Sequence, residues 1–310
     1  MNNKLSQRTA YGEELVALGR ENRNVVALDA DLCRSTMSCL FQDAFPDRFF
    51  EMGIAEQNML STAAGLAAGG KIPFVSTFAV FATGRAYDQI RQTIGIGQLN
   101  VNICGSSSGL SDFGDGSTHQ AVEDIAIMSA IPNLTVLTPC DAIETRKAVH
   151  RAAAIDGPVY IRVGRNLFET YTEEQDEYVV GKLKILAEGE DVAVFAHGVM
   201  VEAAIRAREL LAEEGISARV INVGTMKPFD SIGALREAKS VSAVVTAEEH
   251  SCFGGLASAV ALALRGTAVP MDYVAIEDSY GQSAHSADDL LRFYGLTPEN
   301  ICQKAKELLL

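Results

Sequence analysis

The stretch Glu56-Gln-Asn-Met-Leu-Ser-Thr-Ala-Ala-Gly-Leu-Ala-Ala-Gly-Gly-Lys-Ile-Pro-Phe-Val-Ser76 decides the fold of the N-terminal half. Its apolar and small residues recur at helical spacing up to Gly69-Gly70, a pair that favours the end of a helix. Ile72-Pro-Phe-Val-Ser76 then has the apolar character of a buried strand. The stretch therefore predicts a helix over 56–69 that is followed directly by a strand.

Strands and helices alternate on both sides of this stretch. Upstream, the apolar run Val25-Val-Ala-Leu28 ends in Asp29-Ala-Asp31, as expected for a buried strand that opens into a loop. Apolar strands that alternate with helices predict a parallel, doubly wound sheet. The further elements that we expect downstream are helices at 79–95, 121–130 and 142–154 and strands at 99–104, 134–137 and 159–163.

The character of the sequence changes after Phe168. Acidic and polar residues dominate from Glu169 to Glu177, which suits an interdomain linker, and the residues after them up to Leu186 can form strands. We therefore expect an α/β protein with a first domain at 1–170, a linker at 171–186 and a smaller α/β domain at 187–310. In that second domain we expect strands at 191–196, 218–223, 243–247 and 271–276 and helices at 200–213, 231–238 and 255–264.

Composition narrows the class of protein. The chain of 310 residues has a net charge of −14, which argues against nucleic acids and anionic membranes as main partners. No apolar run is as long as a membrane span, and the first residues lack the apolar core of a signal peptide. We therefore expect a cytoplasmic protein. One or two arginines can still bind a phosphorylated substrate within an acidic chain.

The most informative motif is Glu51-Met-Gly-Ile-Ala-Glu-Gln-Asn-Met59, in which a turn delivers Glu56 to the start of a helix. The helix dipole favours an acidic residue there, so an ordinary first-turn glutamate is one interpretation. The motif also resembles the pyrimidine-binding domain of the transketolase family. In that family Gly-(Ile/Val)-x-Glu-(Gln/His)-x-Met precedes a helix of small residues.

Five ordered matches extend this resemblance along almost the whole chain. Together they are far more specific than any one of them. They are Asp29-Ala-Asp-Leu32 with Ser35, the aromatic pocket Ser76-Thr-Phe-Ala-Val-Phe81, the active-site loop Asp115-Gly-Ser-Thr-His-Gln120, the closing strand Gly157-Pro-Val-Tyr-Ile-Arg-Val-Gly-Arg165, and a loop of the last domain, Glu248-Glu-His250 with Gly254-Gly255.

The resemblance implies thiamine diphosphate as cofactor. This cofactor reacts as a carbanion at C2, which its own 4′-amino group forms by acting as a base once N1′ of the ring is protonated. Glu56 is implied as the catalytic carboxyl group that binds N1′, with Asp31, Phe78 and Phe81 in the same cofactor site. Because Phe78 and Phe81 lie three residues apart, they can share one face of a helical turn or loop and stack on the aminopyrimidine ring.

The resemblance also implies a substrate site. His119 is expected to contact the C1 hydroxyl or carbonyl oxygen of the donor and to act in catalysis, and Asp115 to contact a C2 hydroxyl. Ser35 and one of Arg162 and Arg165 stand at positions typical of phosphate binding, and arginine suits that task. The sequence leaves open which of the two arginines faces the site.

Two departures from the family pattern concern the walls of these sites. Ser107 stands where many sugar-phosphate transketolases carry a histidine, so we expect an unusual acceptor or one bound by a partner subunit. The third aromatic position of the cofactor pocket aligns with Gly84 or Arg85, although Tyr87 lies close by.

The family's other half, which binds Mg²⁺ and the diphosphate, has no counterpart in this sequence. Gly114-Asp-Gly116 resembles the start of its fingerprint, but Asn133 comes too soon and Asn166 too late to complete it. No cysteine pair or Cys/His set suits a metal either. We therefore expect no metal site in this chain, with Mg²⁺ and the diphosphate held mainly by an N-terminal transketolase subunit, in an α2β2 heterotetramer. The isolated chain should be inactive.

The function expected on this basis is that of the C-terminal subunit of a split transketolase, which transfers a two-carbon ketol unit between sugars or sugar phosphates. The alternatives are the β subunit of a 2-oxo acid dehydrogenase and half of a deoxyxylulose-phosphate synthase, both of which Arg85-Ala-Tyr-Asp-Gln89 echoes. The Asp115–Gln120 motif favours ketol transfer. A non-catalytic scaffold homologue is a third alternative, disfavoured because Glu56, Phe78, Phe81 and His119 occur together.

Overall fold

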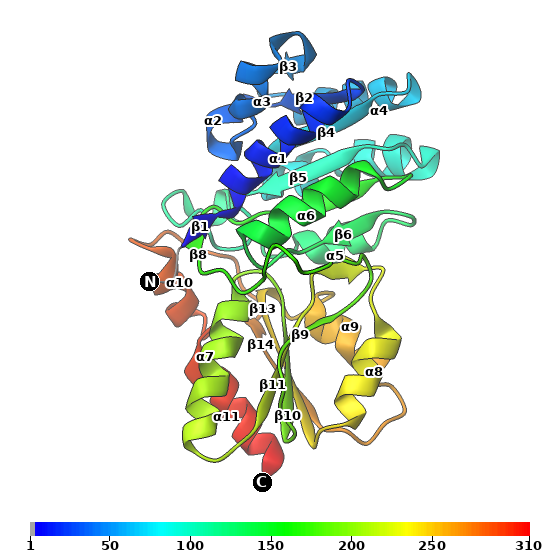
Figure 1. The fold of residues 1–310 in the computed structure, drawn as a ribbon. Helices are drawn as coiled ribbons and strands as arrows, with labels where there is room; N and C mark the ends of the chain where they lie inside the picture. Colours follow the sequence, from blue (N-terminus) through cyan, green and yellow to red (C-terminus); the bar gives the residue numbers. More distant parts are fainter. Residues whose placement is uncertain (1–3) are drawn as a thin grey trace.

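The structure, a computed structural model, describes residues 4–310 and confirms an α/β fold of two domains (Figure 1). Residues 1–3, which belong to the predicted first domain, lie outside the described residues. The N-terminal sheet and its helices form the upper part of Figure 1, and the C-terminal sheet with its helices forms the lower part. The limits of the two domains remain a prediction.

The sheet of the first domain is parallel from β3 to β6, as the strand–helix alternation predicts, and ends in the antiparallel strand β12. Parallel strands place their carboxyl ends at one edge, where loops collect functional side chains. In spatial order the strands are β3 (Phe49–Glu51), β2 (Val25–Asp29), β4 (Ile72–Phe78), β5 (Asn102–Ser106), β7 (Val159–Arg162), β6 (Thr135–Leu137) and β12 (Thr225–Lys227).

Helices cover both faces of this sheet, because successive residues of its strands point to opposite sides. Val25 and Ala27 of β2 join one apolar cluster, and Val26 and Leu28 join the other. The first cluster includes α1 (Gln7–Glu21), α3 (Cys39–Ala44) and α6 (Ala142–Ala153), and the second includes α4 (Glu56–Ala68), the π-helical turns η2 (Phe81–Arg85) and η3 (Gln89–Gly95), and α5 (Asp124–Ser129).

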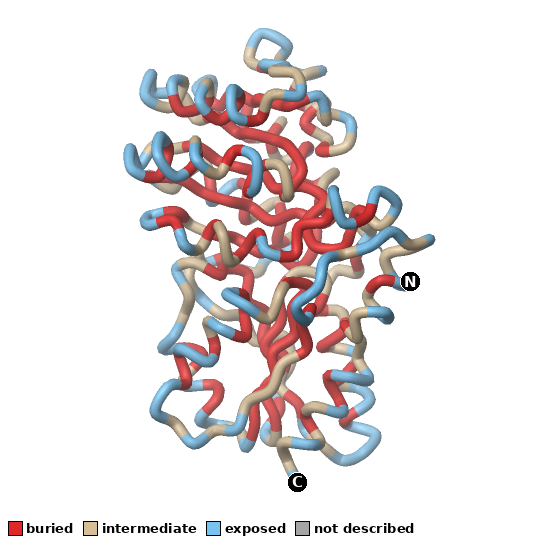
Figure 2. Tube along the Cα trace, turned by 180° about the vertical axis from the view of Figure 1, so that it is seen from behind, coloured by how far each residue is buried: buried red, intermediate tan, exposed pale blue. Residues whose placement is uncertain are grey.

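The second domain repeats this layering at a smaller scale. Figure 2 shows that the strands at the centre of both domains are buried, whereas the outer sides of the helices are exposed. Its sheet has the order β14 (Met271–Ile276), β13 (Ala243–Ser251), β10 (Val192–Ala196), β11 (Ala218–Asn222) and β9 (Lys184–Ala187), with α7 (Met200–Glu213) and α11 (Pro298–Leu309) packed on one face and α8 (Ser231–Lys239) and α9 (Leu256–Ala263) on the other.

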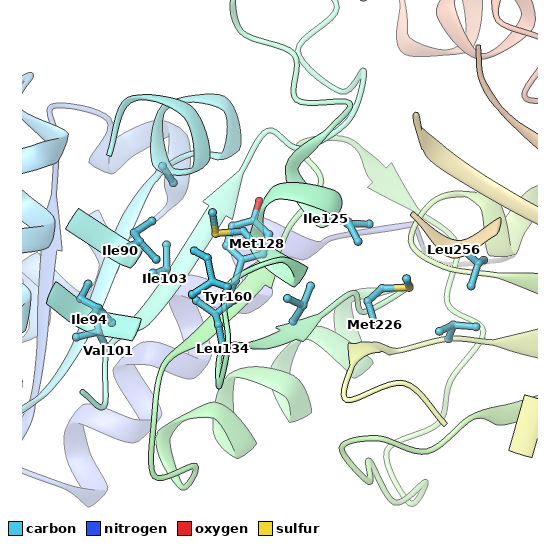
Figure 3. Close-up of a cluster of buried hydrophobic side chains, with 14 of the residues drawn as sticks. Ile90, Ile94, Val101, Ile103, Ile125, Met128, Leu134, Tyr160, Met226 and Leu256 are labelled. Atoms are coloured by element: carbon cyan, nitrogen blue, oxygen red, sulfur yellow. The ribbon is translucent and has the colours of Figure 1, made fainter. Parts of the chain in front are cut away.

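The apolar core runs across the boundary between the domains. β12 follows β11 in the chain but pairs with β6 of the first sheet, and its Met226 joins the core that contains Ile125 and Tyr160 (Figure 3). Leu256 of the second domain belongs to the same cluster. β9 begins within the stretch predicted as a linker. The two domains are therefore joined by shared packing and not only by a linker.

Several predictions about elements need correction. The helix expected at 79–95 is interrupted at Ala86, and much of it winds as the π-helical turns η2 and η3. β13 continues to Ser251, so Glu248-Glu-His250 lies on a strand and not in a loop. Helix α1 and the C-terminal helices α10 (Ala287–Phe293) and α11 were not predicted from the sequence.

Candidate active site

Glu56 lies at the first residue of α4, after a turn in which Gly53 has a φ of +66°. Its side chain is only 2% exposed. Oε1 accepts a hydrogen bond of 2.8 Å from Nη1 of Arg85, whereas Oε2 is buried and has no hydrogen-bond partner among residues 4–310. The structure thus holds one oxygen of a buried carboxylate and leaves the other available.

Three rings form a cluster that Arg85 links to this carboxylate. Phe78 ends β4 and Phe81 begins η2, so the pair bridges a strand and a π-helical turn. Their rings stack at 5.9 Å between centroids with an interplanar angle of 17°. The ring of His119 meets Phe81 edge-on at 5.2 Å and Phe78 at 6.2 Å. Residues distant in sequence therefore form one aromatic cluster.

Arg85 occupies the pocket wall that the sequence left ambiguous. Its Cζ lies 4.7 Å from the centroid of the Phe81 ring while its Nη1 contacts Glu56. Tyr87 packs instead against the apolar core. π-Helical turns are rare and are found frequently at functional sites. Here the turn η2 places a guanidinium group, not a third aromatic ring, between Glu56 and Phe81.

Asp29 organises the loop after β2, a role that the sequence analysis did not assign. Burial raises the pKa of its carboxyl group to about 6, although three hydrogen bonds counteract this effect. Asp31 is exposed, has a φ of 63° and donates its backbone N–H to Glu51. Ser35 is partly buried. The donors to Asp29 are the backbone N–H of Leu32 and the hydroxyl groups of Thr36 and Ser38.

The loop from Ser107 to Glu123 carries the predicted substrate residues. Asp115 is exposed, and His119 is partly buried, with Nδ1 2.9 Å from the hydroxyl oxygen of Thr118. Ser107 has a φ of 51° and a fully buried hydroxyl group that has no hydrogen-bond partner in the part of the chain that the structure describes. The structure brings His119 to the aromatic cluster, whereas Asp115 lies on the solvent side of the loop.

The two candidate arginines are in different environments. Arg162 is buried, and its guanidinium group is engaged by Asp124, with Nε 3.0 Å from Oδ2, and by Glu249. The side chain of Arg165 is 36% exposed and pairs with Asp112 at 2.8 Å. Arg165 is therefore the one whose charge remains accessible.

A further cation, Arg8, lies close to Arg165 and was missed by the sequence analysis. Its Nη1 donates to the backbone oxygen of Ser35 at 3.0 Å. Burial and then the charge of Arg165 lower the pKa of Arg8, and Asp112 partly offsets this effect. A single arginine near the start of a helix carries no signal by itself, and only the fold brings it to Ser35.

Within residues 4–310, no group of three or more His, Cys, Asp or Glu side chains is arranged to hold a metal ion. No helix in this range is long and apolar enough to cross a membrane.

Two family profiles match consecutive parts of the chain. The profile described as the transketolase pyrimidine-binding domain covers residues 3–170, and that of the transketolase C-terminal domain covers residues 181–301. Apart from β12, the strands of the two sheets lie within the two matched ranges.

Curated relatives and solved structures agree with these profiles. The chain is 44% identical to a putative transketolase C-terminal section of Methanocaldococcus jannaschii, over 97% of this chain and 95% of that protein. It is 41% identical to the 6-deoxy-6-sulfo-D-fructose transketolase subunit SqwH of a Clostridium species, over 97% and 94%. A solved structure described as a split gene transketolase, inactive beta4 tetramer, has a TM-score of 0.89 and 44% identity and covers 99% of both chains.

Proposed function

The chain belongs to the transketolase family, and from this premise we propose that it is the C-terminal subunit of a split transketolase. In this proposal it transfers a two-carbon ketol unit between ketose and aldose substrates, together with a separate subunit that binds the diphosphate. This chain supplies Glu56 and the aromatic cluster to the pyrimidine end of thiamine diphosphate. Mg²⁺ and the diphosphate are held mainly by the partner, in an α2β2 assembly.

The observation that carries the proposal is the unpaired oxygen Oε2 of Glu56. A buried acceptor without a donor costs about 1–3 kcal/mol, which a ligand with a suitably placed N–H would recover. The protonated N1′ of an aminopyrimidine ring is such a donor. Phe78 and Phe81 offer aromatic surface beside it. These residues fit the pyrimidine end of the cofactor.

In this proposal each residue of the site has a defined role. When bound, thiamine diphosphate supplies the nucleophilic carbon that reacts with the ketose. Glu56 binds and holds the proton at N1′ through Oε2, while Arg85 holds Oε1 in place. Phe78 and Phe81 orient the ring and exclude water from it. His119, which contacts both rings edge-on, is placed to donate a hydrogen bond to an oxygen of the substrate.

For the substrate we propose Ser35, Asp115, His119 and Arg165, with Arg8 added to them. Burial and then the charge of Arg165 lower the pKa of Arg8, so an anion that contacts Arg8 would be stabilised by both guanidinium charges. A phosphate group on the sugar substrate would be such an anion. Arg162 is left out, because its charge is already paired inside the protein.

The experiment is reconstitution with the subunit encoded by the neighbouring gene, thiamine diphosphate and Mg²⁺. We expect ketol transfer between a ketose and an aldose phosphate by the mixture and by neither subunit alone. The relative described as an inactive tetramer consists of β subunits only, which is consistent with this expectation. Pyruvate decarboxylation without ketol transfer would instead identify a 2-oxo acid dehydrogenase or synthase subunit, and no activity with an assembled complex would favour a scaffold.

Arg8 and Arg165 provide a second test within the same complex. Replacing either with Met should raise the KM for a phosphorylated acceptor about 10- to 100-fold, since each contributes charge-assisted hydrogen bonds of about 1.5–3 kcal/mol. The KM for an unphosphorylated acceptor should change little. Equal effects on both acceptors would contradict the assignment of a phosphate site.

A further inference from the structure

The loop from Ser107 to Glu123 has little regular structure to hold it. It contains one 3₁₀ turn, Gly116–Thr118, and its base is closed by a pair of backbone hydrogen bonds between Gly109 and Ala121. Fixing the backbone of an irregular loop costs about 1–2 kcal/mol per residue, so a loop that presents substrate groups needs contacts that offset this cost.

One of these contacts comes from the other domain. The carboxylate of Glu249, on β13, reaches the base of the loop, where Oε1 accepts the backbone N–H of Leu110 at 2.9 Å. Gly109 has a φ of +60°, and a Cβ at this position would collide with the same carboxylate. The backbone of the loop is therefore shaped around the side chain of Glu249.

Glu249 is itself held by a buried ion cluster. Arg162 places Nη1 3.7 Å from Oε2 of Glu249 and donates from Nη2 to its backbone oxygen at 2.9 Å. Asp124 accepts from both Arg162 and the hydroxyl group of Tyr160. Two carboxyl groups thus share one guanidinium group, and burial raises the pKa of Glu249 to about 7.

Stability alone does not explain a buried cluster of charged groups. Apolar residues of similar volume often stabilise a protein as well as a buried ion pair does, or better. An apolar side chain at position 249 could not, however, accept the N–H of Leu110. The carboxyl group is therefore explained better by the position of the loop than by the stability of the core.

A second segment of the C-terminal domain holds the far part of the loop. Gln120 donates from Nε2 to the backbone oxygen of Gln282 at 3.0 Å, and the backbone N–H of Ala284 donates to Phe113 at 2.9 Å. A Cβ at Gly116 would collide with Ser283. The C-terminal domain thus contacts the loop at its base and again near Asp115 and His119.

We propose that Glu249 is a positioning residue for the substrate site: from the C-terminal domain it fixes the loop that carries Asp115 and His119. This gives the second domain a role in setting the geometry of the reaction. The inference rests on the proposed function only where it concerns substrate, because the contact between Glu249 and the loop belongs to this chain alone.

The test uses Glu249→Leu, which removes the acceptor, and Glu249→Gln, which retains one of the same shape. In the isolated full chain, hydrogen exchange at the amide of Leu110 should be about tenfold faster or more in Glu249→Leu, corresponding to one lost hydrogen bond. Amides of α4 should be unaffected. Glu249→Gln should restore most of the protection.

Glu248→Leu is the matched control. Glu248 is the preceding residue, equally buried, but its carboxylate accepts the backbone N–H groups of Leu256 and Ala257 in its own domain. Its replacement should speed exchange at the start of α9 and leave Leu110 protected. If Glu249→Leu does not fold, Glu249→Asp, which is shorter by one methylene, should show the same effect on Leu110.

In the reconstituted complex, Glu249→Leu should lower kcat/KM for ketol transfer about tenfold or more, with the affinity for thiamine diphosphate unchanged. Unchanged protection of Leu110 in the folded variant would overturn the proposal. So would faster exchange combined with unchanged kcat/KM. If the wild-type complex shows no ketol transfer, the proposed function fails, whereas the exchange experiment still decides whether Glu249 holds the loop.

Discussion

Two buried ion pairs in this molecule are made from similar groups and differ in what they leave unsatisfied. Between the domains, Arg162 is enclosed and contacts Asp124 and Glu249, and both oxygens of Asp124 accept hydrogen bonds. At the start of α4, Glu56 is equally buried, but Arg85 is half-exposed and covers only one of its oxygens.

The difference distinguishes carboxylates that are satisfied within the described residues from Glu56, whose second oxygen we propose binds a cofactor. Buried polar groups in folded proteins are almost always hydrogen-bonded, so the exceptions call for a specific explanation. The interdomain pair satisfies this rule within the chain. The Glu56 pair breaks it at Oε2, and it does so beside an aromatic cluster, where a cofactor ring would complete it.

Replacing Glu56 is expected to have the largest effect on activity. Glu56→Gln keeps the size of the side chain but removes the carboxylate, which forms the ion pair with Arg85 and which we propose holds the proton at N1′. The reconstituted enzyme should lose about 10²- to 10⁴-fold in kcat, as when a general acid–base group is removed. Sedimentation should show that the variant still assembles. Glu13→Gln, a change at an exposed ion pair with Arg146, is the control and should retain full activity.

Arg162→Met tests the other side of the comparison. It leaves Asp124 and Glu249 buried without a cation, so the free energy of unfolding should fall by about 3–5 kcal/mol. Arg165→Met removes a guanidinium group that is itself 36% exposed, and the charge of Arg8 still acts on the buried partner Asp112, so the loss should be at most about 1 kcal/mol. Urea denaturation of the isolated chain measures both. Equal losses of unfolding free energy in the two variants would show that burial does not determine how much each arginine contributes to stability.

The sequence predicted the layers of the fold well, because strand and helix periodicities are local. Val25–Leu28 and the helix after Glu56 could be recognised from spacing alone. The structure places β12 in the sheet of the first domain, a long-range pairing that its three residues do not encode. The π-helical turns likewise escaped prediction, because their apolar spacing resembles that of an α-helix.

The candidate site was predictable where a motif repeats the family pattern, as at Glu56 and His119. It was not predictable where function depends on contacts between distant segments. Arg8 meets Ser35 only after α1 has packed on the sheet, and Arg162 and Arg165 differ only in what surrounds them. Glu249 was assigned to a loop, whereas it lies on a strand that reaches the other domain.

Arg85→Met removes the ion pair at Glu56 and so measures how much this pair contributes to stability. The loss of a half-exposed ion pair and of a cation over Phe81 should destabilise the isolated chain by about 1 kcal/mol, less than the loss of Arg162. In the double variant with Glu56→Gln the two losses should not add, because each removes the same interaction. Thermal unfolding of the four proteins of this cycle measures the coupling. Full additivity would mean that Arg85 does not stabilise Glu56.

Asp29 offers the smallest and most specific test, since it is a buried carboxylate whose partners among the described residues are three hydrogen-bond donors and no cation. Its pKa in the folded chain is about 6, above the ordinary value near 4, so the folded chain binds a proton that the unfolded chain releases between these values. Stability from this group is therefore greatest at low pH and falls as pH rises towards 6. Wild type should lose about 1 kcal/mol more than Asp29→Asn between pH 5 and pH 7. If the free energy of unfolding depended on pH in the same way in both proteins, the three hydrogen bonds would stabilise the charged form of Asp29 as well as a cation could. The distinction between satisfied and unsatisfied carboxylates would then be weaker.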